Sequence, residues 1–466
     1  MLIGIIEFTK GIKIEYTADV VVIGGGPSGV CAALAAARSG TKTLLVEQSG
    51  CAGGMATQGL VGPFMTSYDK QGKKMIIKGL FSEIVDRLVE RGGAIHPSEI
   101  HAGTAFTSWI SEGHDHVTPF DPEILKKLLD DMLQEEKVQV LFHTSFVSPI
   151  MEEGKLQYII VDSKSGLQAV AAKVFIDCTG DGDVAYRCGV PCDKGNIKSG
   201  IMQTASLFFR IGNVNLEEVE ADIQANKHNF YRENGVNYRS FHWRVKEARI
   251  NGDWNLERVS IGMFRGVKPD EWSINTSRIM GVDATDNTSL TFGEIEGRRQ
   301  VQEIFQFLVK YVPGCANAKL LCSAPTIGIR ESRHVQGEYT MESEDVLKGR
   351  VPEDTILLAS NSIDVHGRFG PMSNEYQPIQ DGDWYGIPLR SLIPKGVEQL
   401  LVAGRCISAT SGAAGAIRVM PPCMGTGQAA GTAAAIAVKN NCDVRNIDFK
   451  LLRKNLVEQN VYLPVI

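Results

Sequence analysis

The sequence predicts an α/β protein in which a Rossmann-like domain, a parallel sheet covered by helices, is interrupted by a smaller α+β substrate domain. Three observations support this fold class. A β-α-β pattern with a glycine-rich turn occupies residues 18–47, and a glycine-rich apolar texture returns at 396–440. Between them, residues 200–320 contain more aromatic and charged side chains. Glycine makes up 48 of 466 residues, a share above the roughly 7% of average proteins, and nucleotide-binding folds need many tight backbone turns.

The β-α-β pattern is complete within 30 residues. Residues 18–23 form a β-branched apolar run, which is typical of a parallel strand buried on both faces. Apolar residues at helical spacing follow from 30 to 37, and Gly40 stands where a helix cap is expected. Residues 41–47 then predict another strand, which ends in Glu47.

The turn between this strand and this helix carries glycines in the spacing Gly-x-Gly-x-x-Gly. Gly24 suits the tight turn, Gly26 lets the backbone approach a pyrophosphate, and Gly29 lets helix and strand pack closely. The helix N-terminus directs amide hydrogens at the phosphates. Glu47 lies where a carboxylate accepts hydrogen bonds from ribose hydroxyls. Because that carboxylate also repels a 2′-phosphate, the site disfavours NADP.

Periodicity and capping residues predict the other elements in order. Asp121 and Pro122 form an N-cap followed by proline at the first helical position. An apolar run at 324–329 predicts a strand that ends before Arg330. We expect a helix that opens at Gly425 and is rich in alanine. The remaining predictions are helices over 79–92, 122–133, 216–226, 239–250 and 294–311, and strands over 138–147, 156–163, 167–178 and 400–408.

Composition excludes several classes of protein. A net charge of −6 lacks the basic footprint of a nucleic-acid binder. Ten cysteines occur without a Cys-x-x-Cys pair, and the histidines show no ligand spacing, so we expect no metal site. The uncharged stretch 419–438 contains Pro421 and Pro422, so we expect a buried loop and helix there and no membrane interaction. The start of the chain lacks a signal peptide, and a cytoplasmic location is expected.

Three further segments favour FAD over NAD as the dinucleotide. A glycine-rich stretch follows Glu47, at 50–59, where a flavin protein passes its isoalloxazine and ribityl chain. A strand ends in the sequence Thr-Gly-Asp-Gly-Asp at 179–183. Another ends in Gly404-Arg405 and precedes the glycines of 425–431, where a helix N-terminus can stabilise negative charge on a reduced flavin.

These segments resemble a known group of flavoproteins. The stretches VVVIGGGPSGVCAALAAARSG, FIDCTGDGDVA, GIRESRHVQGEY and LLVAGRCISATSGAAGAIRVMPPCMGTGQAAGTAAAIA are similar to the two-dinucleotide-binding-domain flavoproteins that include fumarate reductases. More narrowly, the chain resembles FAD-dependent oxidoreductases related to the flavin subunit of heterodisulfide reductase. The resemblance spans 18–438 and implies a flavin fold with an inserted substrate domain.

The motif and the resemblance together divide the chain and place the cofactor. The FAD-binding domain is expected over 16–70, 118–200, 320–345 and 396–440, and the substrate or cap domain over 70–117, 200–320 and 345–395. FAD contacts are expected from Gly24, Gly26, Pro27, Ser28, Gly29, Glu47, Gln48, Gly54, Met55, Ala56, Thr57, Val147, Gly180, Asp181, Gly404, Arg405, Gly425, Gly427 and Gln428.

Two departures from the resemblance concern the chemistry. Covalent relatives attach FAD through a histidine shortly before a stretch similar to 56–59, and this chain has Gly53 at that position. We therefore expect FAD to be bound non-covalently. Close relatives often carry a histidine where this chain has Ser411, so the general acid–base residue is not assigned.

The predicted catalytic residues are three arginines. Arg330 and Arg333 follow the predicted strand 324–329, at a strand end where ligands gather. Arg418 lies between the Gly404-Arg405 turn and the helix expected to face the flavin. Buried arginines near a flavin orient carboxylates or stabilise a developing enolate. A structural ion pair is an equally open interpretation of Arg330 and Arg333.

The function expected from the sequence is two-electron redox chemistry, with hydride transfer through FAD, on a small polar or anionic substrate. Two alternatives stay open: a flavin-dependent isomerase or lyase without net redox, and a flavin subunit that relays electrons to a partner protein. The sequence specifies neither the substrate, nor the direction, nor the electron acceptor or donor. A homo-oligomer is compatible with it.

Overall fold

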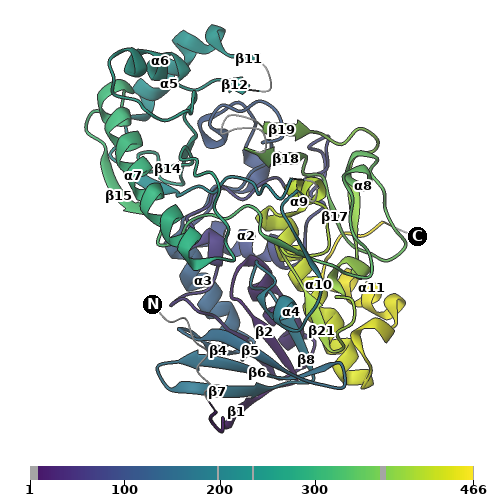
Figure 1. The fold of residues 1–466 in the computed structure, drawn as a ribbon. Coiled ribbons are helices and arrows are strands. Elements are labelled where there is room, and N and C mark those ends of the chain that lie inside the picture. The colour runs from purple at the N-terminus through teal and green to yellow at the C-terminus, as the bar shows by residue number, and fades with distance from the viewer. Residues whose placement is uncertain (1–8, 197–198, 234–235, 368–373, 465–466) are drawn as a thin grey trace.

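The computed structural model describes residues 9–196, 199–233, 236–367 and 374–464. Its centre is a five-stranded parallel sheet whose middle strand, β2, is buried along its whole length (Figure 1). The strand order places the predicted β-α-β unit at the middle of the sheet. In spatial order the strands are β21 (Leu400–Val402), β8 (Val174–Asp177), β2 (Val20–Ile23), β3 (Thr43–Val46) and β4 (Gln139–Leu141).

Helices cover this sheet, and two of them are in unusually close contact. Helix α1 (Pro27–Arg38) lies directly against α10 (Met420–Asn440), and both are almost entirely buried. Gly40 follows α1 with a φ of +83°, so its predicted capping role is confirmed. The surrounding helices are α2 (Leu80–Glu90), α3 (Pro122–Glu135) and α11 (Phe449–Glu458). Asp121 caps α3 as predicted and accepts hydrogen bonds from the backbone of Glu123 and Ile124.

A separate four-stranded sheet packs beside the parallel one, at the bottom of Figure 1. Its order is β1 (Ile14–Thr17), β7 (Gly166–Ala171), β6 (Lys155–Ser163) and β5 (Ser145–Glu152). The single strand predicted over 138–147 is therefore wrong: its first part is β4 and its end begins β5, in the other sheet. The hairpin is confirmed as β6 and β7, but residues 174–177 leave it to become β8.

The chain between 205 and 327 builds a second hydrophobic core around Trp272, Phe209 and Phe307. Its antiparallel sheet has the order β13 (Met263–Arg265), β14 (Trp272–Ile274), β10 (Phe209–Gly212) and β15 (Lys319–Ser323). Three helices and one hairpin accompany it: α5 (Leu216–Asn226), α6 (His242–Ile250), α7 (Asn287–Tyr311), β11 (Tyr231–Glu233) and β12 (Val236–Tyr238). We call this unit the cap; Figure 1 shows it above and to one side of the parallel sheet.

The segment after the cap returns to the first core. Ile356, Leu358 and Tyr385 are fully buried in the same cluster as β2 and α1. Within 345–395, these apolar strands pack in the core that contains β2, α1 and α10. The elements of this segment are β16 (Arg333–Val335), α8 (Ser343–Leu347), β17 (Thr355–Ala359), β18 (Ile363–His366), β19 (Asn374–Gln377), β20 (Tyr385–Pro388) and α9 (Ser411–Ile417). Strand β16 pairs with β9 (Cys192–Lys194), which precedes the cap in the chain.

Two local predictions, the strand over 324–329 and the start of α10, are wrong. The run 324–329 is not a strand; only Gly328 forms an isolated bridge, with Ser206. Helix α10 begins at Met420 and not at Gly425, because Pro421 and Pro422 are accommodated in a first turn, where no backbone N–H is needed. The helix predicted over 216–226 is α5 with the same limits, and those predicted over 79–92, 239–250 and 294–311 are present with altered limits as α2, α6 and α7.

Among the described residues, no helix combines the length and the apolar character needed to cross a membrane. In the same ranges, no three His, Cys, Asp or Glu side chains gather as a metal ion would require. The ten cysteines all lie in the described ranges and are free thiols.

Candidate active site

A cavity of about 850 Å³ lies between the carboxyl ends of the parallel strands and the cap. Its wall includes Ile23, Val46 and Cys178, which end or follow three neighbouring strands, and cap residues such as Phe208 and Asn275. The volume falls in the range of roughly 300–1,000 Å³ that ligand sites occupy. Ligands of open α/β sheets bind at this edge.

The glycines of the turn have the geometry that a pyrophosphate site requires. Gly24 has a φ of +96°, and a Cβ there would lie 2.4 Å from the Cys178 carbonyl oxygen. A Cβ on Gly29 would lie 1.8 Å from the Gly24 carbonyl oxygen, so this glycine serves close packing. A Cβ on Gly26 would meet nothing within 4 Å, because Gly26 faces the cavity. It is also the N-cap of α1, which has no side-chain cap. These features fit the phosphates of a dinucleotide.

Glu47 holds this turn in place from the end of β3. Its Oε2 accepts a hydrogen bond from the Gly25 amide at 2.5 Å, and its Oε1 accepts one from the Ser49 amide at 2.7 Å. The residue is buried and lines the cavity. Its carboxylate therefore both supports the phosphate-binding turn and faces the space that a ribose would occupy.

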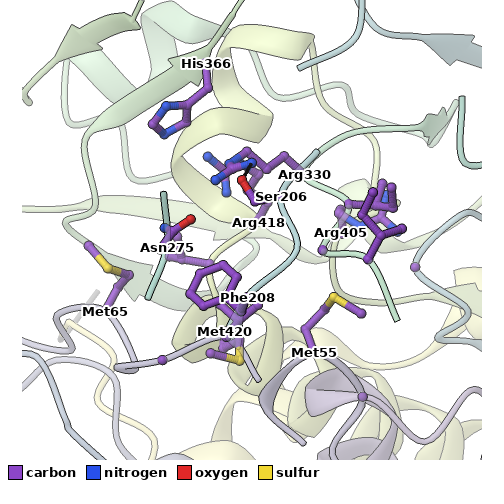
Figure 2. A pocket seen from close by; sticks show the side chains of 18 of the residues that line it. Met55, Met65, Ser206, Phe208, Asn275, Arg330, His366, Arg405, Arg418 and Met420 are labelled. Carbon is purple, nitrogen blue, oxygen red and sulfur yellow. Dashed lines mark hydrogen bonds between the residues drawn. The ribbon is translucent and has the colours of Figure 1, made fainter. Parts of the chain in front are cut away.

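Arg405 lies beside Gly180 and forms a partly buried ion pair with Asp181. Its Nη2 lies 2.7 Å from the Asp181 Oδ1, and its Nη1 donates to the Ser332 hydroxyl at 2.7 Å. The Ser332 hydroxyl donates to the same Asp181 oxygen at 2.5 Å. Arg405, Asp181 and Gly180 all line the cavity, and Figure 2 shows Arg405 on the side of Met55.

The structure brings together part of the predicted cofactor set. The residues that line the cavity are Gly24, Gly26, Pro27, Ser28, Glu47, Gln48, Gly54, Met55, Gly180, Asp181 and Arg405. Those outside its lining are Gly29, Ala56, Thr57, Val147, Gly404, Gly425, Gly427 and Gln428. Near Val147, the residues that line the cavity are Thr144–Phe146.

The α10 residues of the second group have other contacts. Gly425 packs against Leu357, and Gly427 packs against the backbone of Ser28. The Gln428 side chain accepts a hydrogen bond from the Leu80 amide at 2.8 Å and donates one to Gln459 at 3.0 Å. Because α10 begins five residues earlier than predicted, these positions lie inside the helix and serve helix packing.

Of the three predicted catalytic arginines, two line the cavity. The Arg330 Nη1 donates to the Thr204 carbonyl at 2.7 Å and to the Ser206 hydroxyl at 2.9 Å. Arg418 donates to the Asp364 carbonyl at 3.0 Å. Figure 2 shows Arg330, Ser206 and Arg418 side by side in the cavity wall.

Arg333 is not part of the cavity lining. It belongs to β16, where its Nη1 forms an ion pair with Asp183 at 2.8 Å and donates to the Asp181 carbonyl at 3.1 Å. Its guanidinium also lies over the Tyr186 ring, 4.1 Å from the centroid. The open interpretation of Arg333 as a structural ion-pair partner is the one that this geometry favours.

The cap adds four arginines that sequence reasoning missed, and all of them line the same cavity: Arg232, Arg239, Arg258 and Arg278. Burial and the neighbouring guanidinium of Arg258 lower the pKa of Arg278. Burial, with Arg418 and Arg278, likewise lowers the pKa of Arg330. The cavity therefore concentrates positive charge in a poorly solvated space, a condition that favours binding of anions.

Asp364 and His366, on β18, form a hydrogen-bonded pair in this cluster. The His366 Nε2 lies 2.7 Å from the Asp364 Oδ2, and its Nδ1 lies 3.1 Å from the Arg278 Nη2. Since the arginine can only donate, the imidazole accepts at Nδ1 and donates from Nε2. Burial, reinforced by Arg278 and Arg330, lowers the pKa of His366 to about 3. The imidazole is thus neutral at physiological pH.

Two other side chains with possible reactivity also line the cavity. Burial raises the pKa of Cys423 to about 12, and its thiol donates to the Arg418 carbonyl at 3.3 Å. Cys423 is therefore a packed thiol at neutral pH. Burial lowers the pKa of His114, whose Nδ1 contacts the Glu112 carbonyl at 3.2 Å.

No sequence signal identified the missed residues. Arg239, Arg258 and Arg278 are separated by about twenty residues each and belong to no motif, and His366 is far in sequence from all three. They meet because the cap folds back over the parallel sheet. A cluster of this kind is a property of the tertiary structure.

The fold and the site together define a dinucleotide-binding enzyme of the flavoprotein class. A family model described as FAD dependent oxidoreductase matches residues 19–456. The chain belongs to this family. It is an FAD-dependent oxidoreductase, and FAD is its cofactor.

Solved structures include similar folds at low sequence identity. One is a geranylgeranyl bacteriochlorophyll reductase-like protein from Thermoplasma acidophilum, at 14% identity and a TM-score of 0.45, covering 95% of this chain and 83% of that chain. Another is p-nitrophenol 4-monooxygenase from Pseudomonas putida DLL-E4, at 11% identity and a TM-score of 0.46, covering 95% and 84%. A comparison with curated protein sequences found no match.

Proposed function

We propose that the enzyme performs two-electron redox chemistry on a small anionic molecule bound between the flavin site and the cap. FAD, when bound, supplies the acceptor or donor of the hydride. The observation that carries this proposal is the position of Arg330 and Arg418 in the wall of the same cavity as the phosphate-binding turn. A guanidinium presents a planar pair of donors that matches a carboxylate.

The contacts of these two arginines leave donors for a ligand. The Arg330 guanidinium donates to the protein through Nη1, and the Arg418 Nε is buried without a hydrogen-bond partner among the described residues. Both side chains are held by neutral acceptors on the protein. We infer that they bind and orient an anionic group, and that their charge stabilises negative charge that develops during the reaction.

The Asp364–His366 pair supports a second candidate function. A neutral imidazole that lines the cavity, oriented at Nε2 by the Asp364 carboxylate, can accept a proton at its Nδ1, the nitrogen that contacts Arg278 in this structure. This arrangement favours an isomerase or lyase in which the flavin undergoes no net redox change. Turnover in the absence of any electron acceptor distinguishes this function from the one proposed above.

The proposal is tested by adding a panel of small organic acids to the purified holoenzyme under anaerobic conditions and following the flavin absorbance. A substrate of the proposed kind bleaches the flavin. Once it is found, Arg330→Lys and Arg418→Lys should lower the rate of bleaching at least about tenfold with FAD content intact. Arg265→Lys, a cap arginine outside the cavity, is the control. Rates close to wild type in both cavity variants would refute the proposal.

We also propose that FAD is held non-covalently. Gly53 has a φ of +104°, and a Cβ there would lie 2.5 Å from the Thr57 side chain. A histidine at this position would be strained, which supports the absence of the covalent linkage. Acid precipitation should release all the flavin into the supernatant; flavin that stays in the pellet would contradict this.

Three further points from the sequence stay proposals. The nearer relation to fumarate reductases and to the heterodisulfide reductase flavin subunit is supported by the sequence stretches alone. A cytoplasmic location agrees with the ten free thiols. Exposed Phe292 and Ile295 on α7 are compatible with a homo-oligomer, which light scattering would detect.

A further inference from the structure

We propose that the substrate carries two anionic groups, which bind at two different pairs of arginines in the wall of the cavity. One binds at Arg330 and Arg418. The other, a carboxylate or a phosphate, binds at Arg239 and Arg258 of the cap. This inference rests on the proposed function and specifies the substrate class. We call Arg239 and Arg258 the cap pair.

Hydrogen bonds fix the backbone carbonyl of Arg258, and the guanidinium of the same residue is available to bind an anion. The Arg258 carbonyl accepts hydrogen bonds from the Trp254 Nε1 and from the Arg249 Nη2, both at 2.9 Å. Its side chain lines the cavity, and its Nε is buried with no hydrogen-bond partner among the residues that the structure describes. A buried guanidinium donor without a partner is costly. An anion in the cavity would remove that cost.

Arg239 is fixed by neutral groups alone. Its Nη1 donates to the Ser108 carbonyl at 2.7 Å and to the hydroxyls of Ser108 and Ser240, both at 2.9 Å. Its backbone amide donates to the Ser260 hydroxyl at 3.1 Å. Only 9% of its surface is exposed, and it lines the cavity. Ser108 and Ser240 thus hold the charged side chain in position without neutralising it, and Ser260 holds the backbone of the same residue.

The charges that surround Arg330 and Arg418 differ from those that surround the cap pair. Asp364 acts on Arg330 and Arg418 and partly offsets the effect of burial on the pKa of each. At the cap pair the situation is different. Burial and Arg278 lower the pKa of Arg239, and burial, Arg239 and Arg330 lower the pKa of Arg258. Only other cations accompany burial there, so a second anion fits the cap side.

One molecule can reach both pairs of arginines. Arg330 and Arg258 line the same cavity, and the Arg330 guanidinium is close enough to contribute to lowering the pKa of Arg258. The phosphates of FAD are expected at the N-terminus of α1, around Gly26, and so they do not account for the cap pair. The second anion therefore belongs to the substrate.

The test uses the FAD-loaded protein and three probes of similar size: butyrate with one charge, succinate with two carboxylates, and 3-phosphonopropionate with a carboxylate and a phosphonate. Binding is followed by the change in the flavin absorption band. In the wild-type protein we expect one of the two dianions to bind about ten- to a hundredfold more tightly than butyrate. The dianion that binds better identifies the second group as carboxylate or phosphate.

Arg258→Gln should reduce this preference to less than about threefold. Arg258→Lys, which keeps the charge but not the fork, should give an intermediate value. Arg265→Gln is the matched control, because Arg265 is a cap arginine that does not line the cavity. FAD content and the melting temperature show that each variant is folded.

Two results would overturn the inference. If butyrate and both dianions bind equally to the wild-type protein, there is no second anion site, although the proposed function with a single anionic group stands. If Arg258→Gln keeps the full preference for a dianion, the second site lies elsewhere. A wild-type protein that responds to none of the three probes would contradict both this inference and the anionic substrate of the proposed function.

Discussion

Gly427 of α10 lies so close to Ser28 of α1 that a Cβ at position 427 would be 2.0 Å from the Ser28 carbonyl oxygen. Gly431 stands in the same relation to Ala32, at 2.1 Å. The two helices are therefore in backbone contact over at least one turn. Since Ser28 belongs to the phosphate-binding turn, the glycines of α10 act on the cofactor site through the position of α1.

Gly427→Ala should separate these helices and destabilise the protein. A methyl group forced against backbone in a packed core costs about 1–3 kcal/mol, and displacement of α1 should also lower the FAD content. Urea unfolding and flavin absorbance measure the two effects. Gly11→Ala is the control, since a Cβ at the exposed Gly11 meets nothing within 4 Å. Unchanged stability and FAD content in Gly427→Ala would mean that the helices adjust without cost.

Much of the fold could be predicted because its signals are local. The strand 20–23, the turn from Gly24 to Gly29 and the strand ending at Glu47 follow one another in the chain, so their residues are also neighbours in space. The start of α10 was predicted wrongly because a glycine such as Gly425 or Gly427 can indicate either a helix N-terminus or a close packing contact within a helix. The partner that decides between them, Ser28, is about 400 residues away in the sequence.

Glu47→Ala should weaken FAD binding by about 1.5–3 kcal/mol, the range for hydrogen bonds to a charged group. The variant loses the acceptor for the Gly25 and Ser49 amides as well as the carboxylate that faces the ribose position. Titration of the apoprotein with FAD measures the affinity. Glu152→Ala, at an exposed position on β5, should bind FAD normally. An unchanged FAD affinity in Glu47→Ala would show that the turn needs no support from β3.

His366→Gln should make the stability of the protein less sensitive to acid. In the folded protein the pKa of His366 is lowered from 6.5 to about 3. Between these values the unfolded chain binds a proton that the folded chain does not, so the stability of the wild type falls as the pH falls below about 6.5. Glutamine does not titrate, and its amide can still donate to Asp364.

The measurement is urea unfolding at several pH values between 7 and 4.5. The wild type should lose more of its unfolding free energy over this interval than His366→Gln does. His228→Gln, at an exposed position, should follow the wild type. Parallel curves for wild type and His366→Gln would indicate that the imidazole is protonated in the folded state at mildly acidic pH.

The candidate site could be predicted only where it is built from the parallel sheet. Arg330 and Arg418 were found because they follow motifs, although the strand inferred before Arg330 does not exist. Arg239 and Arg258 come from cap segments whose local sequence resembles any charged surface loop. Their burial results from the cap core around Trp272 and Phe209, and that core is assembled from distant segments.

Arg333→Lys should reduce stability and leave catalysis intact, in contrast to the expectation from the sequence. Arg333 is 7% exposed, and its guanidinium binds Asp183, the Asp181 carbonyl and the Tyr186 ring at the same time. A lysine ammonium cannot reproduce these three contacts from one position. We expect a loss of about 1.5–3 kcal/mol in the free energy of unfolding.

Because Arg333 does not line the cavity, FAD content and the rate of flavin reduction by substrate should stay within about twofold of wild type, measured well below the melting temperature. Arg330→Lys, tested beside it, should show the opposite result, with slow reduction and less change in stability. A variant at position 333 that is as stable as wild type but reduced slowly would place Arg333 in the reaction after all.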